Sequence, residues 1–525
     1  MSDAGRYGHR VFVQLDQGGV QRGFILDNAP VQCEVEQEAA ADPLRLVEFG
    51  PGLVVESLPL KAAALVGESA ADSGSLSATL ALDAFDVWSA RADHPLQTIT
   101  VRVWLAMVDD TGLPVWEDGT DRPLSNAAEI FRGVLRDPAP DLDAGTLSFT
   151  AAPILRTVDI MFPPCAIEAE RFPDAPEDST ANAVPIIYGT VQGLPLRAVS
   201  DVTADPIRLV VAGHPIVSLS LDIYRDGLLV DAGVPVLYDI DEMGGEYAYV
   251  EIAKADYTAG SNLYARTVTG WRAPDGTAID ALGDVLLHLW RTYSDERYYE
   301  LDLRRAEAAR ATLNRYSIGV YSDTQQADTG LIRILVSWIG GQFPVAFGAS
   351  GGRFGWDATR IPTDVEIPGL TVGTLTYGLD AHDREGPAES SADEIVNRWE
   401  IHYGLDGYAR GAVSVLRADW RTMGALRGSV SRWGESPIER VDCPAISTPD
   451  SAWSVLTDRA RLKSVVRESV TYHALDGTWY AQPLFGVVLV TDARCGYDRE
   501  PCLIVGLAPS LDGRVSMSLL RIRGV

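Results

Sequence analysis

The side chains that could support catalysis lie in a few short motifs, and each motif lacks part of the pattern that its chemistry needs. Residues 348–352, Gly-Ala-Ser-Gly-Gly, match the G-x-S-x-G pattern of serine hydrolases. A nucleophile elbow requires a helix directly after the serine. Here the residues that follow, Arg353-Phe354-Gly355-Trp356, have a strand-like pattern. A tight hairpin turn is therefore the interpretation that we favour, and no catalytic residue is assigned.

Patterns for metal and cofactor binding are also incomplete. Residues 239–244, Asp-Ile-Asp-Glu-Met-Gly, resemble the opening of a calcium loop, but Met243 and Val250 stand where oxygen ligands are needed. The acidic turn at residues 117–121 is either a weak ion site or, as we favour, a solvated loop. The chain has no phosphate loop and no dinucleotide-binding fingerprint. The sequence therefore predicts no metal site and no cofactor.

The histidines and cysteines do not form ligand clusters. Seven histidines are spread singly along the chain: His9, His94, His214, His288, His382, His402 and His473. His288 is expected on the flank of a helix. The cysteines are an odd, scattered set: Cys33, Cys165, Cys443, Cys495 and Cys502. Such a set does not make a disulfide framework, so we expect all five to be reduced packing residues. With no catalytic constellation found, we predict that the protein is not an enzyme.

Charge and composition limit the possible partners. The chain of 525 residues has 44 basic and 73 acidic residues, a net charge of −29. An acidic surface repels DNA phosphates, so ordinary nucleic-acid binding is excluded. The acidity either keeps the protein soluble or lines a channel through which DNA passes without binding. No apolar run is long enough for a membrane helix, and the N-terminus has no signal core. We expect assembly in a cytoplasm.

The hydrophobic pattern predicts a mainly β protein with a smaller α+β part. Alternating runs such as Ser75–Leu82 and Thr98–Leu105 predict strands with one buried face. Helices are expected at 280–293 with Asp280 as N-cap, at 303–316, at 329–339, and at 449–466 with Thr448 as N-cap and Pro449 first. Prolines in residues 156–200 are expected to bar a central strand there and to favour a surface-running connector.

Four regions follow from these patterns. We predict a first β-barrel region at 1–155, a proline-rich connector and middle β domain at 156–270, an α+β domain at 271–365, and a helix-bearing region with a second β-barrel at 366–525. The architecture expected is thus two small β-barrels, a middle β domain and a short helical segment.

Two distant hairpins have nearly the same sequence pattern. Residues 131–135, Phe-Arg-Gly-Val-Leu, lead through Ala139-Pro140 and an Asp/Gly turn to Thr146–Phe149. Residues 503–507, Leu-Ile-Val-Gly-Leu, lead through Ala508-Pro509 and another Asp/Gly turn to Val515–Leu519. Hairpins with Asp-Gly turns are common, so chance similarity is one explanation. The other is that one small barrel is built twice in this chain.

The order of these segments resembles that of the tail hub proteins of long-tailed bacteriophages. Three stretches carry the resemblance. The first is residues 83–150, with Ile130-Phe131-Arg132-Gly133-Val134-Leu135 between an earlier strand and an acidic turn. The second is Pro185-Ile186-Ile187-Tyr188-Gly189, similar to a P-I-x-Y-G connector. The third runs from Asn397 through the helix at 449–466 to the last barrel at 480–525, where hubs pack a helix against the barrel. Gly486-Val487 departs from the Gly-Asp pair of hubs.

The resemblance implies a structural hub of a phage tail tip or baseplate. Such hubs form homotrimers whose two barrels per chain make a pseudo-sixfold ring. The ring joins the sixfold tail tube to threefold tip components and surrounds the DNA exit channel. The implied partners are distal tail and tail tube proteins, the tape measure protein, and central fibre or spike proteins. The implied location is the virion tail tip, after assembly in the host bacterial cytoplasm.

Three alternatives remain open, one of which is a cytoplasmic multidomain β protein of unknown role. A sixfold distal tail or fibre-adaptor protein would have a single barrel. A carbohydrate-binding or carbohydrate-degrading tail protein would need an exposed aromatic platform or a carboxylate pair. Tryptophans that could supply such a platform are Trp104, Trp116, Trp271, Trp356 and Trp479.

Overall fold

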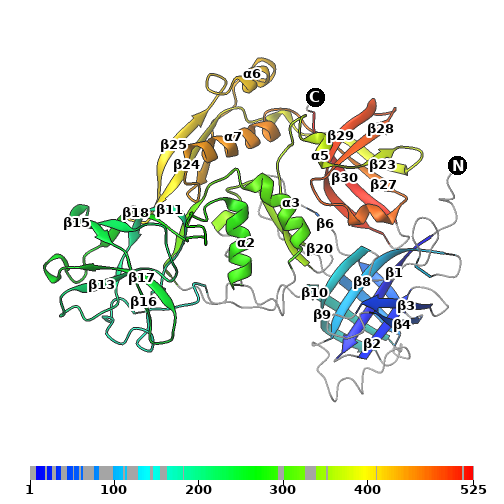
Figure 1. Ribbon diagram of the computed structural model, residues 1–525. Helices are drawn as coiled ribbons and strands as arrows, with labels where there is room; N and C mark the ends of the chain where they lie inside the picture. The colour runs from blue at the N-terminus through cyan, green and yellow to red at the C-terminus, as the bar shows by residue number, and fades with distance from the viewer. Residues whose placement is uncertain are drawn as a thin grey trace.

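A computed structural model shows a chain built mostly of β-strands, with a few short helices beside the central sheet (Figure 1). The structure describes residues 8–17, 20–25, 31–36, 44–50, 53–57, 61–62, 76–81, 99–109, 113–114, 128–141, 146–153, 162–180, 182–293, 301–324, 338–350, 353–408, 411–510 and 514–523. The fold class predicted from the sequence, mainly β with a smaller α+β part, is confirmed.

The N-terminal part of the chain forms a nine-stranded sheet in the order β3-β4-β2-β1-β8-β9-β10-β7-β5. Along β10, Leu147, Phe149 and Ala151 are buried and the residues between them are half-exposed, as the alternating pattern predicts. The strands are β1 (Gly8–Gln17), β2 (Val20–Ile25), β3 (Val31–Glu36), β4 (Leu44–Gly50), β5 (Leu53–Ser57), β7 (Leu76–Ala81), β8 (Thr100–Val108), β9 (Ala128–Asp141) and β10 (Thr146–Pro153).

The C-terminal part forms a second sheet in the order β22-β28-β29-β30-β27-β23, and β6 (Lys61–Ala62) adds to β29. The strands are β22 (Thr371–Thr376), β23 (Ala381–Glu389), β27 (Glu468–Ala474), β28 (Val487–Asp492), β29 (Tyr497–Pro509) and β30 (Val515–Arg521). The two edges β22 and β23 are joined by one short turn, in which the Gly378 N–H donates to the Ala381 carbonyl at 2.7 Å. The sheet therefore curls into a partial barrel that closes at this end.

A third, eight-stranded sheet, which we call the central sheet, has the order β15-β14-β18-β11-β24-β25, with β19 on β11 and β26 on β24. Its strands are β11 (Ile186–Pro195), β14 (Ser220–Arg225), β15 (Leu228–Pro235), β18 (Leu263–Thr269), β19 (Gly319–Ser322), β24 (Trp399–Asp406), β25 (Gly411–Ala418) and β26 (Glu439–Cys443). They come from three of the four predicted regions, whose boundaries stay a prediction.

Two smaller β units and the helices complete the described fold. A four-stranded sheet has the order β12-β13-β17-β16, and β20 pairs with β21. These strands are β12 (Arg197–Ala198), β13 (Ile207–Ala212), β16 (Leu237–Ile240), β17 (Glu246–Ile252), β20 (Val345–Ser350) and β21 (Arg353–Ala358). The α-helices are α2 (Leu282–Tyr293), α3 (Leu303–Leu313), α5 (Ile367–Leu370), α6 (Arg427–Trp433) and α7 (Pro449–Lys463). The 3₁₀ turns are η5 (Lys254–Asp256), η6 (Ala392–Glu394), η7 (Gly424–Leu426) and η8 (Gly477–Ala481).

The predicted N-cap is confirmed for helix α7 but not for helix α2. The Thr448 hydroxyl accepts from the Ser451 N–H, and Pro449 is the first helical residue. Helix α2 begins at Leu282, so the prediction that Asp280 is its N-cap was wrong. The Asn314 amide oxygen accepts from the Asp284 N–H at 3.1 Å, so a residue from the end of α3 replaces the local cap. The helix predicted at 329–339 lies almost wholly outside the described residues.

Helix α7 packs differently from the expectation that the hub resemblance gave. Its buried residues Ala452, Val455 and Leu456 belong to the core that also contains Trp399 and Ile401 of β24. Only Leu462, near its end, contacts the core of the seven-stranded C-terminal sheet. The helix therefore covers the central sheet rather than the second barrel, because its apolar stripe faces β24.

Strand β11 contradicts the prediction that residues 156–200 contain no central strand. It pairs with β18, β19 and β24 and is largely buried. Its prolines do not interrupt the ladder, since Pro185 precedes the strand and Pro195 is its last residue. The P-I-x-Y-G motif therefore leads into an inner strand of the central sheet.

Gly189 of this motif is required by a close approach of two backbones. Its φ of +61° lies in the left-handed region, and a Cβ at this position would lie 1.7 Å from the carbonyl oxygen of Ile318. The Gly189 N–H donates to the Ile279 carbonyl, and its carbonyl accepts from Gly270. No side chain fits here without moving the backbone before β19.

We expect Gly189→Ala to destabilise the protein by more than about 4 kcal/mol, because it combines strain with a backbone clash. Gly227→Ala is the matched control, since Gly227 also has a positive φ but a Cβ added there would meet no atom within 4 Å. That control is expected to cost only about 1–2 kcal/mol. Urea unfolding followed by tryptophan fluorescence measures both, and equal losses would contradict the assignment.

Candidate functional site

The two end sheets share one strand topology. The N-terminal sheet contains the run β8-β9-β10-β7-β5, and the C-terminal sheet contains β28-β29-β30-β27-β23. In each run three consecutive strands form a meander, β8 to β10 in the first and β28 to β30 in the second. The strand that precedes the meander in the sequence, β7 or β27, pairs with the last strand of the meander. A still earlier strand, β5 or β23, pairs with that one. All four steps in each run are antiparallel. Five strands in the same spatial and sequential order indicate a duplicated unit, beyond the likeness of the two hairpins.

The two hairpins that resemble each other in sequence occupy equivalent places in these runs. Strands β9 and β10 have 14 and 8 residues, and β29 and β30 have 13 and 7. The pairing begins at Asp141↔Thr146 in the first hairpin and at Pro509↔Val515 in the second. Each hairpin has one register shift, and the Asp/Gly turns themselves lie outside the described residues.

The two units differ at their first edge. Strand β1 pairs with β8 in antiparallel orientation, whereas β22 pairs with β28 in parallel orientation. The N-terminal sheet also extends to β2, β4 and β3, and no ladder joins β3 to β5 among the residues that the structure describes. The duplication is therefore one of the five-strand unit and not of the whole sheet.

A continuous apolar core holds the two end sheets side by side (Figure 1). Leu105, Leu135 and Phe149 of the first sheet belong to the same cluster as Leu507 and Met517 of the second. Two further connections cross the boundary. Strand β6 pairs with β29 at Ala62↔Gly506 and Lys61↔Leu507, and the η8 turn, which carries buried Tyr480, contacts β8 and β9. The pair of sheets is thus a single packed body, which is the candidate functional surface of this chain.

The motifs that could have indicated catalysis or ion binding have structural roles. Strands β20 and β21 form a hairpin with Ser350 opposite Arg353, so the tight turn predicted for the G-x-S-x-G motif is confirmed. In the loop that resembles a calcium site, Asp241 accepts from the N–H groups of Met243 and Gly245 and forms an ion pair with Arg171. The Asp241 carboxylate therefore stabilises the turn in which it lies. The acidic turn at 117–121 lies outside the described residues.

Two histidines that the sequence places far apart meet in an aromatic cluster at the entrance of β11. The ring of His214 stacks on Trp271 with centroids 4.0 Å apart, and Trp271 contacts the ring of His288 at 4.4 Å. The Tyr188 hydroxyl and His288 Nδ1 are 2.8 Å apart. Sequence reasoning missed this cluster, because its members are separated by up to 100 residues. The tyrosine of the P-I-x-Y-G motif was the one available signal.

Both ring nitrogens of His214 form hydrogen bonds, and one of these bonds reaches the motif. The Ile187 N–H donates to His214 Nε2 at 3.0 Å, and His214 Nδ1 lies 3.0 Å from the Pro215 carbonyl, to which it donates. These bonds fix the neutral tautomer. Burial lowers the pKa of His214 from its ordinary 6.5 to about 3, because a charged ring cannot be solvated there. Burial also lowers the pKa of His288. The cluster therefore works as a neutral packing unit at physiological pH.

Buried charges tie the helices to the sheets around them. Arg305 of α3 donates through Nε to Asp357 and through Nη1 to the Gly348 carbonyl, at 2.9 and 3.1 Å. Asp458 of α7 accepts from the Tyr316 hydroxyl. Burial raises the pKa of Asp458 above its ordinary value. Each pair joins elements distant in the sequence, which gives these charges a structural role.

Two of the cysteines are buried packing residues. Burial raises the pKa of the Cys443 and Cys502 thiols to about 12, which suits packing residues. Among the described residues, no three His, Cys, Asp or Glu side chains gather in a way that would hold a metal ion. None of the described helices combines the length and apolar composition needed to cross a membrane.

Neither a protein-family model nor a curated protein matches this chain. Several solved structures are similar to it. The 43 kDa tail protein of prophage MuSo2 from Shewanella oneidensis is 10% identical, with 98% of this chain and 99% of that chain covered and a TM-score of 0.34. Prophage tail protein gp18 from Listeria monocytogenes EGD-e is 9% identical, with 97% and 94% covered and a TM-score of 0.36. The tail protein from Neisseria meningitidis MC58 is 10% identical, with 64% and 96% covered and a TM-score of 0.27. Likenesses with TM-scores below 0.5 do not establish a common fold.

Replacing His214 by Gln is expected to change how stability depends on pH. Between pH 6.5 and about 3, His214 is protonated in the unfolded chain but stays neutral in the folded chain. Its contribution to the free energy of unfolding is therefore complete above pH 6.5 and is lost as the pH falls. The wild-type slope should exceed that of His214→Gln by up to about 1.4 kcal/mol per pH unit.

Chemical unfolding at pH 7.5 and pH 4.5, followed through tryptophan fluorescence, measures the two slopes. Exposed His382 supplies the control, since His382→Gln should leave the slope unchanged. A wild-type slope equal to that of His214→Gln would contradict the buried, neutral state assigned to His214.

Proposed function

We propose that this chain is a structural hub of a phage tail tip or baseplate. Three copies form a ring in which the two end sheets of each chain supply six similar surfaces. That ring joins the sixfold tail tube to threefold components of the tip and surrounds the channel through which DNA leaves.

The observation that carries the proposal is the duplicated five-strand unit. A closed ring of three identical chains has only threefold symmetry. It can meet a sixfold cylinder evenly only if each chain presents two similar surfaces at similar distances from the axis. The runs β8-β9-β10-β7-β5 and β28-β29-β30-β27-β23 meet the first condition, and their common core fixes their separation.

The charge of the chain supports a channel for DNA rather than a DNA-binding site. Nonspecific DNA binding is driven by basic side chains that release counterions from the phosphates. A protein with a net charge of −29 has no excess of such side chains. Acidic side chains that face the lumen would let DNA pass without adhering. A lumen lined mainly by arginine in a reconstruction of the particle would contradict this part of the proposal.

The function is that of assembly and not of catalysis. The partners proposed are distal tail and tail tube proteins on the sixfold side, with central fibre or spike proteins on the threefold side and the tape measure protein in the channel. The protein acts in the virion tail tip after assembly in the bacterial cytoplasm.

A carbohydrate-binding role receives little support from the tryptophans. Trp104 and Trp356 are fully buried, and Trp271 and Trp479 are half-buried against apolar clusters. Trp116 lies outside the described residues. A sixfold distal tail protein with a single barrel receives less support than the hub, because this chain carries the five-strand unit twice.

Light scattering of the purified full chain tests the stoichiometry. Three chains of 56.7 kDa give a particle of about 170 kDa, and electron-microscopic class averages should show threefold symmetry around a hole. A sixfold particle would favour the distal ring, and a chain that stays monomeric at micromolar concentration would contradict both.

A further inference from the structure

Among the described residues, the central sheet ends in two edges that pair with no further strand and run in the same direction. Strands β15 and β25 are the last strands of the path β15-β14-β18-β11-β24-β25. Four of its five steps are antiparallel and the step from β11 to β24 is parallel. An even number of reversals leaves β15 and β25 pointing the same way. Open edges carry unpaired backbone groups that favour pairing with another strand.

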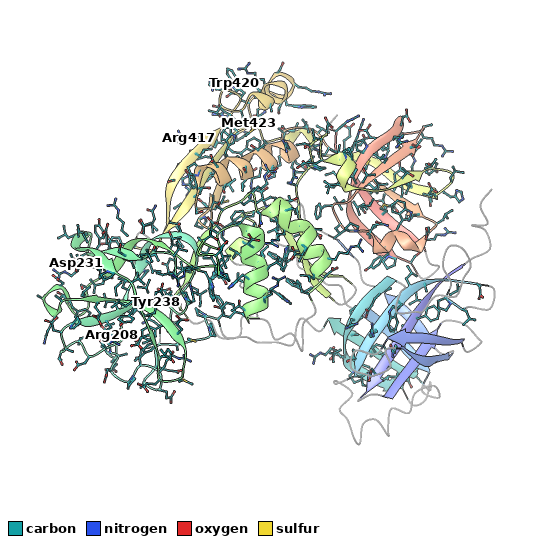
Figure 2. The ribbon with its side chains drawn as sticks, in the orientation of Figure 1. Arg208, Asp231, Tyr238, Arg417, Trp420 and Met423 are labelled. Carbon is teal, nitrogen blue, oxygen red and sulfur yellow. The ribbon has the colours of Figure 1, made fainter. Side chains whose placement is uncertain are left out.

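The β15 edge is apolar and lies in an acidic part of the molecule. Leu228 and Leu229 are 74% and 54% exposed, and Asp231 beside them is exposed (Figure 2). Residues 201–262, which we call the acidic lobe, hold eleven acidic and three basic residues, a net charge of −8. The acidic residues are Asp201, Asp205, Asp222, Asp226, Asp231, Asp239, Asp241, Glu242, Glu246, Glu251 and Asp256, and the basic ones are Arg208, Arg225 and Lys254.

The segment that contains the β25 edge has the opposite net charge, although Arg417 itself pairs with Glu400 of β24. Val415 and Arg417 on this strand are 54% and 74% exposed. The chain then continues into a projecting segment that ends with α6 (Figure 2). Residues 411–433, which we call the arginine tip, hold Arg417, Arg421, Arg427 and Arg432 against Asp419, a net charge of +3 in a chain of −29. Neither Arg427 nor Arg432 has an acidic partner among the described residues.

We propose that the β25 edge and arginine tip of one copy dock on the β15 edge and acidic lobe of a second copy, head to tail around the ring. This inference rests on the trimer proposed above. Two-fold pairing of one edge strand with its own copy would bring like charges together, whereas a head-to-tail contact joins unlike edges. Apart from the tip the chain carries −32, the difference between −29 and +3. A second copy therefore supplies the acidic surface that the tip requires.

The strand directions fit this contact. A rotation about an axis along the strands keeps their direction, so β25 of one copy meets β15 of the next as a parallel neighbour. Pairing would satisfy backbone groups on both edges and cover Leu228, Leu229 and Val415. The contact is electrostatic at its rim and apolar at its centre, as protein interfaces are.

A pair of cysteines tests the contact directly. The variant carries Leu229→Cys together with Val415→Cys. Within one chain the two edges are five strand spacings apart, about 24 Å, which is too far for a disulfide. Mild oxidation should therefore link neighbouring copies into a covalent trimer on a non-reducing gel. The control joins Val415→Cys to Leu379→Cys, a still more exposed site in the turn between β22 and β23, and should give no trimer.

Charge reversal supplies a second measurement. Arg427→Glu with Arg432→Glu should raise the trimer dissociation constant at least about tenfold at low salt, and less at 0.5 M salt, because salt screens exposed charges. Arg440→Glu on strand β26, which pairs with β24 and not with β25, is the control, since Arg440 pairs with Asp442 within its own strand and lies outside the tip.

The outcomes separate this inference from the proposed function. A trimer that neither forms the disulfide nor responds to tip reversal overturns the edge contact and leaves the hub proposal standing. A wild-type chain that never forms a trimer overturns both. Wild-type binding to phosphatidylglycerol vesicles that the tip reversal abolishes, with the trimer unchanged, would assign the tip to a membrane surface and overturn the inference.

Discussion

The shared apolar core of the two end sheets is the constraint on which the proposed assembly depends. Two copies of a five-strand unit on a flexible tether could not keep a fixed separation. Here Leu135 and Leu507, from opposite ends of the sequence, are buried in one cluster, and β6 adds to β29 across the boundary. Because protein interiors resist deformation, this core sets the spacing of the two units. The spacing decides whether three chains can meet a sixfold partner evenly.

Strand β11 places a second constraint, which acts on the middle of the molecule. It contacts strands from three regions of the sequence, so the middle of the molecule cannot separate into independent domains without breaking its ladders. Gly189 permits the close approach to Ile318, and His214 fixes the backbone two residues earlier. A short motif thus controls how the open edges β15 and β25 are oriented. The strands of the central sheet therefore form one connected unit.

Local patterns in the sequence predicted much of this fold, and long-range contacts explain what they missed. Period-two alternation and Asp/Gly turns are local, so both hairpins could be predicted. The order of β5, β7 and their counterparts could not, because it depends on which distant strands pair. Asp280 has the right residue type for a helix cap, but Asn314 from another helix takes that role. Prolines near β11 suggested a connector, yet they flank the ladder rather than interrupt it.

For the site, the sequence predicted the hairpin at Ser350 but could not reveal which surfaces assemble. A net charge of −29 on each chain opposes a ring of three copies, yet the Debye length at physiological salt is about 8 Å. Charges further apart than this interact weakly, so the sign of each contact matters more than the total. Arg427 and Arg432 lie in a segment of opposite sign to the acidic lobe around Asp231. A ring can therefore form through locally complementary contacts and still leave an acidic lumen for DNA.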